Sequence, residues 1–331
     1  MVLNRQPSKS IISEFLSKLD YKMKGGLIMP AIIIDGEAVA KKIKEGLKAE
    51  IEAFKAKGSP LQLVAVQVGE NPSSKVYTNQ QKKACEEMGL IYSLKELSAA
   101  TTEPELLKFV EELNKDKSVT GIILQMPLPQ GINARNVQVK ISPSKDVEGL
   151  NPHNMGLLVF GKQVVAPCTA MGAVELLKST GVELKGKEVV IVGHSEIVGK
   201  PILLLMLQSL TESATPTVCH IATKDTPSHV RRADIVFVAV GKAGLVKGDW
   251  IKPGAIVIDI GINRVPNIGP DGKQLIDEKT GKPRMKTVGD VEFEKAKEVA
   301  GMISPVPGGV GPLTVTMLIK NTVECAKVLY R

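Results

Sequence analysis

The chain has 331 residues, of which 43% are hydrophobic and 24% are charged, with a formal net charge of +8 at pH 7. The balance is typical of soluble globular proteins with two domains of ordinary size, and no apolar run is long enough for a membrane span. The excess of Lys is spread along helices beside Glu, which argues against a nucleic-acid partner and favours attraction of anionic small molecules.

Residues 1–28 carry both basic and acidic side chains and a short amphipathic patch over residues 11–16. A transit peptide is poorer in acidic residues, and a secretory signal has a longer apolar region. We therefore interpret residues 1–28 as a disordered extension and expect the first domain to open at Met29.

The four cysteines, Cys85, Cys168, Cys219 and Cys325, lie far apart and form no Cys-x-x-Cys pair, and no His joins them at metal-ligand spacing. We expect free thiols, no metal site, and a reducing compartment such as the cytoplasm.

From Met29 onward, strand and helix patterns alternate, which predicts an α/β fold. In the first domain, residues 29–150, strands are expected at 61–68, 91–97 and 119–124, and helices at 74–88 and 106–113. Thr102-Glu-Pro-Glu105 forms a capping box that opens the second of these helices, and Gln125 closes the third strand.

The second domain, residues 151–312, is expected to hold a helix at 171–179 and strands at 188–192, 217–221, 234–240 and 255–260. Strands joined by crossovers predict a Rossmann-type parallel sheet. Residues 313–331 follow as a C-terminal helix.

A candidate nucleotide turn follows the first strand of this second sheet. The strand 188–192 leads into Gly193-His-Ser195 and then Gly199-Lys-Pro201, a tight turn and helix start that can present backbone N–H groups to a phosphate. The spacing matches neither G-x-G-x-x-G nor a P-loop. Taken alone, it supports a cofactor turn and a purely structural turn equally.

Candidate cleft residues occur in separate segments. Taken singly, each has a structural interpretation: Tyr77 as a half-buried aromatic, Gln125 as a polar strand end, Asp146 as a turn or cap residue, and Gly308, Gly309 and Gly311 as a tight loop before a helix. Tyr77 and Gln81 lie four residues apart and share one helix face. Together with the Pro-rich segment after Gln125 and the loop 304–312, they predict one binding cleft.

Five segments stand in a distinctive order: Val68-Gly69 to Gly89, Gln125-Met-Pro-Leu-Pro129, Lys145-Asp-Val-Glu-Gly149, Gly193-His-Ser-Glu-Ile-Val-Gly-Lys-Pro201 and Pro305-Val-Pro-Gly-Gly-Val-Gly-Pro312. In this order they resemble the methylenetetrahydrofolate dehydrogenase/methenyltetrahydrofolate cyclohydrolase family of one-carbon metabolism. The resemblance covers the chain from about Met29 to the C-terminus. It implies two α/β domains with a cleft between them, a C-terminal helix packed on the first domain, a homodimer, and an enzyme acting on tetrahydrofolate derivatives.

The resemblance also implies roles for individual residues. Gly193, His194, Ser195 and Ile221 would bind a nicotinamide cofactor, with Ile262 beside the nicotinamide ring. Asp146 would pair with the pterin, Tyr77 would stack on the aminobenzoate ring, and Gln125 would hold the residue at 81. The cleft wall would include Pro305, Gly308 and Gly309.

Cofactor choice depends on two departures from the family pattern. NADP-preferring relatives commonly have Arg at the position of His194 and Ser at the position of Ile221. Here a neutral His and an apolar Ile supply neither a permanent charge nor a hydroxyl for the 2'-phosphate, so NAD is favoured over NADP. Lys224 and Arg231 are alternative sources of charge.

The largest departure is Gln81, because the family has a Lys there. Lys82 and Lys83 are turned by about 100 or 200 degrees from that helix face and are not obvious replacements. Hydride transfer depends mainly on orientation, whereas hydrolysis of the methenyl product needs proton transfers that an amide cannot make. The resemblance therefore implies a dehydrogenase with weak or absent cyclohydrolase activity.

Three alternatives remain open from the sequence. The first is a fully bifunctional enzyme, and the second is a non-catalytic folate-binding relative. The third is another Rossmann dehydrogenase acting on a small acid, which would need a cationic carboxylate clamp with a Lys/Asp pair that the sequence does not identify.

Overall fold

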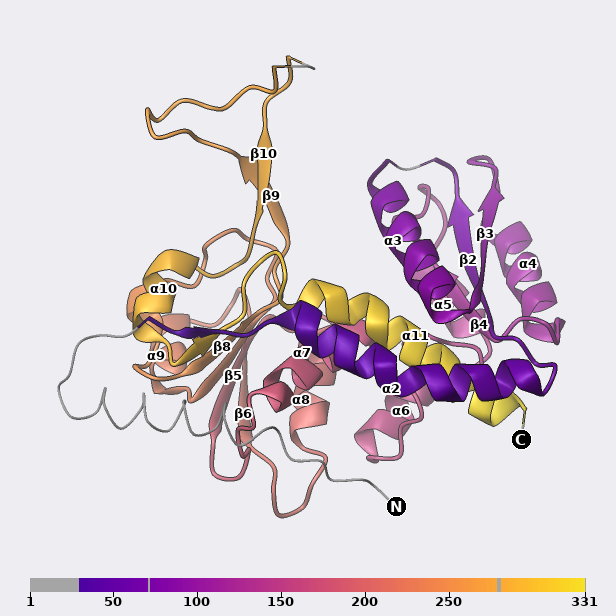
Figure 1. Ribbon diagram of the computed structural model, residues 1–331, viewed down its shortest axis with the longest axis horizontal. Coiled ribbons are helices and arrows are strands. Elements are labelled where there is room, and N and C mark those ends of the chain that lie inside the picture. The colour runs from indigo at the N-terminus through magenta and orange to yellow at the C-terminus, as the bar shows by residue number, and fades with distance from the viewer. Residues whose placement is uncertain (1–29, 71, 279–280, 331) are drawn as a thin grey trace. The chain divides into compact units, whose positions relative to one another are not determined.

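The computed structural model describes residues 30–70, 72–278 and 281–330 (Figure 1). The extension predicted over residues 1–28 lies outside the described residues. The chain divides into two compact units. One, the six-stranded unit, combines the described residues up to Val39 with Gly172–Leu313, and the other, the three-stranded unit, combines Ala40–Met171 with the described residues from Thr314 onward. Helices α2 (Gly36–Ala56), α7 (Cys168–Ser179) and α11 (Val310–Leu329) each contribute residues to both units.

The six-stranded unit is built on a parallel sheet with the order β1-β11-β8-β7-β5-β6. Its strands are β1 (Ile32–Ile33), β5 (Glu188–Val192), β6 (Thr215–Cys219), β7 (Ile235–Val238), β8 (Ile256–Asp259) and β11 (Met302–Ile303). Every residue of β7 and β8 is buried, as expected for strands of a parallel sheet covered on both faces. This confirms the predicted Rossmann-type parallel sheet.

The helices of this unit are α8 (Gly199–Met206), α9 (Thr226–Arg232), α10 (Phe293–Val299) and the short 3-10 helix η1 (Gly248–Trp250). Asp225 caps α9, since its Oδ1 accepts a hydrogen bond from the backbone N–H of Ser228 at 3.0 Å. An antiparallel hairpin of β9 (Asn263–Pro266) and β10 (Met285–Val288) extends away from the parallel sheet (Figure 1). The sequence analysis did not predict this hairpin.

The three-stranded unit contains the parallel sheet β3-β2-β4, with β2 (Gln62–Val68) between β3 (Ile91–Leu97) and β4 (Gly121–Leu124). Its helices are α3 (Pro72–Met88), α4 (Glu103–Lys115), α5 (Ala134–Lys140) and α6 (Pro152–Val159). The predicted capping box is confirmed, because the backbone N–H of Thr102 donates to Glu105 Oε2 at 2.8 Å. The central strand β2 is buried along almost its whole length, whereas the edge strand β3 is largely exposed.

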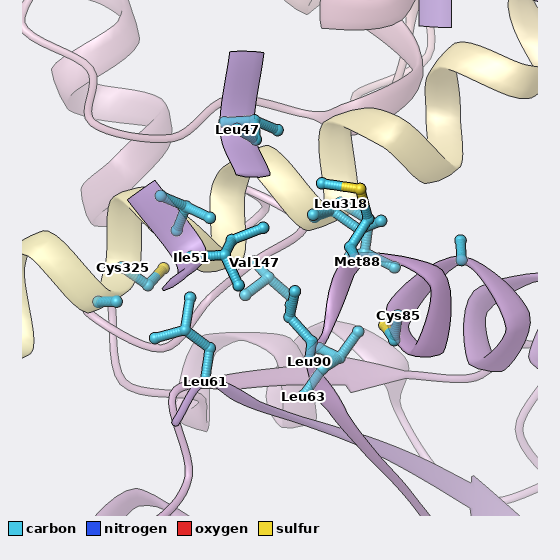
Figure 2. Packing of buried hydrophobic residues seen from close by; sticks show 14 of the residues in the cluster. Leu47, Ile51, Leu61, Leu63, Cys85, Met88, Leu90, Val147, Leu318 and Cys325 are labelled. Carbon is cyan, nitrogen blue, oxygen red and sulfur yellow. The ribbon is translucent and has the colours of Figure 1, made fainter. Parts of the chain in front are cut away.

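Figure 2 shows the main core of the three-stranded unit. Side chains from several elements meet there: Leu47 and Ile51 of α2, Leu61 and Leu63 at β2, Cys85 and Met88 of α3, Val147, and Leu318 and Cys325 of α11. Burying one such Leu or Ile side chain stabilises the fold by about 1.5–3 kcal/mol. The end of the chain therefore completes a core that begins more than two hundred residues earlier, at Leu47.

No helix in the described part of the chain is both long enough and apolar enough to cross a membrane.

Candidate active site

The turn from Gly193 to Val198 occupies the point where the strand order of the parallel sheet reverses. β6 lies on one side of β5, and the next strand along the chain, β7, lies on the other. Ligands of open α/β sheets bind beyond the carboxyl ends of the strands at such a point. The turn links β5 directly to the amino end of α8.

The glycines of this turn are required by its own packing. Gly193 has φ of 121°, and a Cβ there would collide with the carbonyl oxygen of Ala239. A Cβ at Gly199 would collide with the carbonyl oxygen of Gly193. The turn is closed by a hydrogen bond from the backbone N–H of Lys200 to the carbonyl of Ser195 at 3.0 Å. The glycine pattern alone therefore could not distinguish a structural turn from a cofactor turn.

The free donors of the turn do point to a ligand. Among the described residues, no acceptor receives a hydrogen bond from the backbone N–H groups of His194, Ser195 or Ile197. Ser195 Oγ accepts from the N–H of Val198 at 3.2 Å, which ties Ser195 to the residue that precedes α8. Unpaired N–H groups at a helix amino end form an anion-binding arrangement, so these residues fit the pyrophosphate of a dinucleotide.

Two imidazoles lie beside this turn. The rings of His194 and His220 stack with their centroids 4.9 Å apart and their planes 23° from parallel. His220 Nδ1 accepts a hydrogen bond from the N–H of Ala222 at 3.2 Å, so its Nε2 carries the proton in the neutral ring. Ile221 is fully exposed, at 103% of its reference area. The ends of β5 and β6 therefore bring the predicted cofactor residues His194 and Ile221 to the same edge of the sheet.

Two buried carboxylates, Asp259 and Asp290, accept hydrogen bonds from the backbone after β7, β8 and β10. The sequence analysis missed both. Asp259 accepts hydrogen bonds from the N–H groups of Gly261, Asp290 and Val291 at 2.9–3.0 Å. Asp290 accepts from the N–H groups of Val240 and Gly241 at 2.6 and 2.9 Å and from Asn263 Nδ2 at 2.8 Å. Burial raises the pKa of Asp259 to about 7. This network fixes the loop that carries Ile262, which is 55% exposed. For Asp259, the sequence offered one signal, because this Asp ends the apolar run of β8 (Ile256–Asp259).

Pro305, Gly308 and Gly309 follow β11 within the six-stranded unit. Gly308 has φ of 99°, and its carbonyl accepts a hydrogen bond from the N–H of Gly36 at 2.9 Å. A Cβ at Gly36 would collide with the carbonyl of Gly309, so these glycines allow two chain segments to approach closely.

In the three-stranded unit, Gln81 and Gln125 are in direct contact. Gln125 Nε2 donates to Gln81 Oε1 at 3.0 Å, and the hydroxyl of Tyr92 donates to the same oxygen at 3.1 Å. Both Gln side chains are buried. Tyr77, one turn earlier on α3, is 46% exposed.

The lysines that follow Gln81 do not take its place. Lys82 Nζ lies 3.9 Å from Glu86 Oε1, and Lys83 Nζ lies 3.9 Å from Glu87 Oε1. Both lysine side chains are largely exposed, so they belong to the solvated face of α3. This agrees with their predicted rotation away from the face of Gln81.

Asp146 is buried and makes the hydrogen bonds of a turn residue. Its Oδ2 accepts from the N–H of Asn151 at 2.8 Å and from Asn154 Nδ2 at 2.9 Å. Burial raises the pKa of this carboxyl group, and the hydrogen bonds oppose that shift. A role in binding the pterin stays a prediction.

Glu148 is a second carboxylate that the sequence analysis did not single out. The segment 145–148 runs beside β4, with the N–H of Ile122 donating to the carbonyl of Lys145 at 2.8 Å. Asp146 and Glu148 stand on either side of Val147, whose side chain is fully buried. Burial and the nearby Asp146 raise the pKa of Glu148 to about 8, although a hydrogen bond from the N–H of Leu124 lowers it. Two carboxylates around a buried Val were a signal that the sequence offered.

Comparisons with known proteins cover both units. The family model described as "Tetrahydrofolate dehydrogenase/cyclohydrolase, catalytic domain" matches residues 34–148, and its "NAD(P)-binding domain" counterpart matches residues 167–330. "Bifunctional protein FolD" of Geotalea daltonii is 48% identical over 297 residues, which are 90% of this chain and 99% of the relative.

Two solved structures are also similar. The bifunctional enzyme FolD, a methylenetetrahydrofolate dehydrogenase/cyclohydrolase of Campylobacter jejuni, has a TM-score of 0.80 and 41% identity and covers 90% of this chain and 99% of its own. The Trypanosoma brucei enzyme of the same name, solved with NADP and an inhibitor, has a TM-score of 0.82 and 38% identity, covering 92% and 99%.

Proposed function

The chain belongs to the tetrahydrofolate dehydrogenase/cyclohydrolase family, and from this membership we propose that it oxidises 5,10-methylenetetrahydrofolate to 5,10-methenyltetrahydrofolate. The oxidant is NAD or NADP, whose nicotinamide ring accepts the hydride from the methylene carbon. The observation that carries this proposal is the turn at the switch point of the six-stranded sheet, with its unpaired N–H groups. A non-catalytic folate binder would have no need of such a turn.

For the cofactor, we propose that the N–H groups of His194, Ser195 and Ile197 hold the pyrophosphate and that Ile262 packs beside the nicotinamide. NAD is the preferred form. His194 and Ile221 supply no permanent charge to a 2'-phosphate, and the Nδ1 lone pair of His220 is already used by the N–H of Ala222. The Trypanosoma brucei relative binds NADP, so the preference is a property to be measured on this chain.

For the folate, we propose that Tyr77 stacks on the aminobenzoate ring and that the pair of carboxylates at 146 and 148 binds the pterin N–H groups. Within the pair, Glu148 is the stronger candidate. Asp146 already accepts hydrogen bonds from Asn151 and Asn154, whereas the protein supplies Glu148 with one backbone donor, from Leu124. Pro305, Gly308 and Gly309 remain predicted lining residues.

The second half of the family's chemistry, hydrolysis of the methenyl product to 10-formyltetrahydrofolate, is proposed to be weak or absent. Water must attack the amidinium carbon while a protein group moves protons. Gln81 cannot titrate, and Lys82 and Lys83 lie in ion pairs on the exposed face of α3. Orientation of the substrate for hydride transfer does not require a titrating group at this position.

Time-resolved product analysis tests this division of activities. Purified protein is mixed with 5,10-methylenetetrahydrofolate and either NAD or NADP, and the methenyl and 10-formyl products are separated. We expect the methenyl product to accumulate and the 10-formyl product to form only at the uncatalysed rate. Rapid formation of the 10-formyl product would show a fully bifunctional enzyme, and absence of any oxidation would refute the dehydrogenase.

We also propose a cytoplasmic homodimer. Four free cysteines suit a reducing compartment. Light scattering of the purified protein measures the oligomeric state, and a monomer at micromolar concentration would contradict the proposal.

A further inference from the structure

Packing in the core explains the ring of Tyr92 but not its hydroxyl group. Tyr92 lies on the edge strand β3, opposite Leu63 of β2, and its ring packs half-buried against the core of the three-stranded unit. A Phe would serve that packing equally well. The hydroxyl, however, reaches the side chain of Gln81 and donates to its Oε1 at 3.1 Å. Burial raises the pKa of the hydroxyl, so it is protonated and remains a donor at neutral pH.

The two donors to Gln81 together determine its orientation. An amide oxygen has two lone pairs, and here they are filled by Tyr92 and by Gln125 Nε2 at 3.0 Å. The Gln81 side-chain nitrogen, in contrast, donates to no residue in the described parts of the chain. Because the amide group is planar, fixing the oxygen also fixes the direction of both N–H bonds.

We propose that Tyr92 is a positioning residue that, with Gln125, locks Gln81 as a fixed hydrogen-bond donor to an acceptor atom of the folate substrate. The inference rests on the proposed function. It assigns Gln81 the task of binding and orienting the substrate, with no proton transfer. Losing the Tyr92 hydroxyl leaves the amide held by one donor, which permits rotation away from the substrate. One neutral hydrogen bond corresponds to an effect of about fivefold.

A double-mutant cycle tests the proposal with nearly isosteric changes. Wild type, Tyr92→Phe, Gln81→Met and the double variant are compared by steady-state dehydrogenase kinetics, with folate and nicotinamide cofactor varied in turn. We expect Tyr92→Phe to lower kcat/KM for the folate about fivefold, mainly through KM. In the Gln81→Met background the same change should have less than about a twofold effect, and KM for the cofactor should stay constant throughout.

Equal losses in both backgrounds, or no loss in either, would overturn the proposal and leave Tyr92 as a packing residue only. Thermal melting of the four proteins separates loss of folded protein from loss of binding, and Gln81→Ala replaces Gln81→Met if the latter does not fold. Failure of the proposed dehydrogenase function can be distinguished from failure of the role proposed for Tyr92. If the wild type oxidises no substrate, the same cycle is measured by calorimetric titration with tetrahydrofolate, and its coupling decides the role of Tyr92.

Discussion

Replacing Asn321 with Ala should destabilise the three-stranded unit more than a change at any neighbouring polar position of α11. Asn321 is completely buried, and its Nδ2 donates to the backbone carbonyls of Val147 at 2.8 Å and of Ala166 at 2.9 Å. The Val147 carbonyl keeps a second donor, Cys168 Sγ at 3.3 Å. The Ala166 carbonyl would become a buried acceptor without a donor.

An orphaned buried acceptor costs about 1–3 kcal/mol, and a smaller loss is expected at Val147. Part of this loss is offset by a gain. The Oδ1 of Asn321 is itself buried without a partner among the described residues, and the substitution removes this unsatisfied atom. The net loss in the free energy of unfolding should be about 2–3 kcal/mol.

Thr322→Val is the matched control. Thr322 is equally buried, but its Oγ1 donates only to the carbonyl of Leu318 in its own helix, at 2.8 Å. That carbonyl remains within the helical hydrogen-bond ladder, so the loss should stay below about 1 kcal/mol. Urea unfolding followed by circular dichroism measures both variants. If Asn321→Ala is no more destabilising than Thr322→Val, the reasoning from the two carbonyls is refuted.

Three further predictions concern the candidate site. Gln81→Lys should raise the rate of methenyl hydrolysis by at least about a hundredfold over wild type, since a lysine amine can transfer protons; an unchanged rate of 10-formyl formation would place the defect elsewhere. The KM for the folate should fall as pH rises through about 8, where the carboxylate of Glu148 forms. Glu148→Gln should abolish this pH dependence, whereas Asp146→Asn, which removes the negative charge that helps to raise the pKa of Glu148, should keep the pH dependence but move it to lower pH. His194→Arg combined with Ile221→Ser should raise kcat/KM for NADP by at least about tenfold through charge-assisted hydrogen bonds; a smaller change would show that another cation already binds the 2'-phosphate.

The sequence predicted the elements whose pattern is local. Strands β3 and β5 occupy the predicted residues 91–97 and 188–192. β5 holds a continuous run of Val and Ile, and β3 follows the turn at Gly89, so both patterns are local. Strands β1 and β11 contain two residues each and exist only by pairing across the chain, so no local pattern could reveal them. The hairpin of β9 and β10 mixes polar and apolar residues without a regular period, and pairing alone defines it.

The candidate site shows the same division. The contact between Gln81 and Gln125 was implied by family resemblance, but the hydrogen bond from Tyr92 depends on how α3 lies over β3. That packing is a property of the tertiary structure, so no spacing in the sequence encodes it visibly. Glu148 was visible in the sequence only as the second acid of Asp146-Val-Glu148, because its burial and its hydrogen bond from the N–H of Leu124 depend on how this turn packs beside β4.

The chain passes between the two units three times, and this path has a consequence for folding during synthesis. The parallel sheet needs Met302 and Ile303 of β11 to join β1 to β8, and the core shown in Figure 2 needs Leu318 and Cys325. Neither unit can therefore complete its sheet or core before these residues have been synthesised. Contacts of such long sequence separation slow folding and leave apolar strands exposed in the growing chain. A cut at the boundary between the two matched family domains would therefore release fragments that each lack part of a sheet or core.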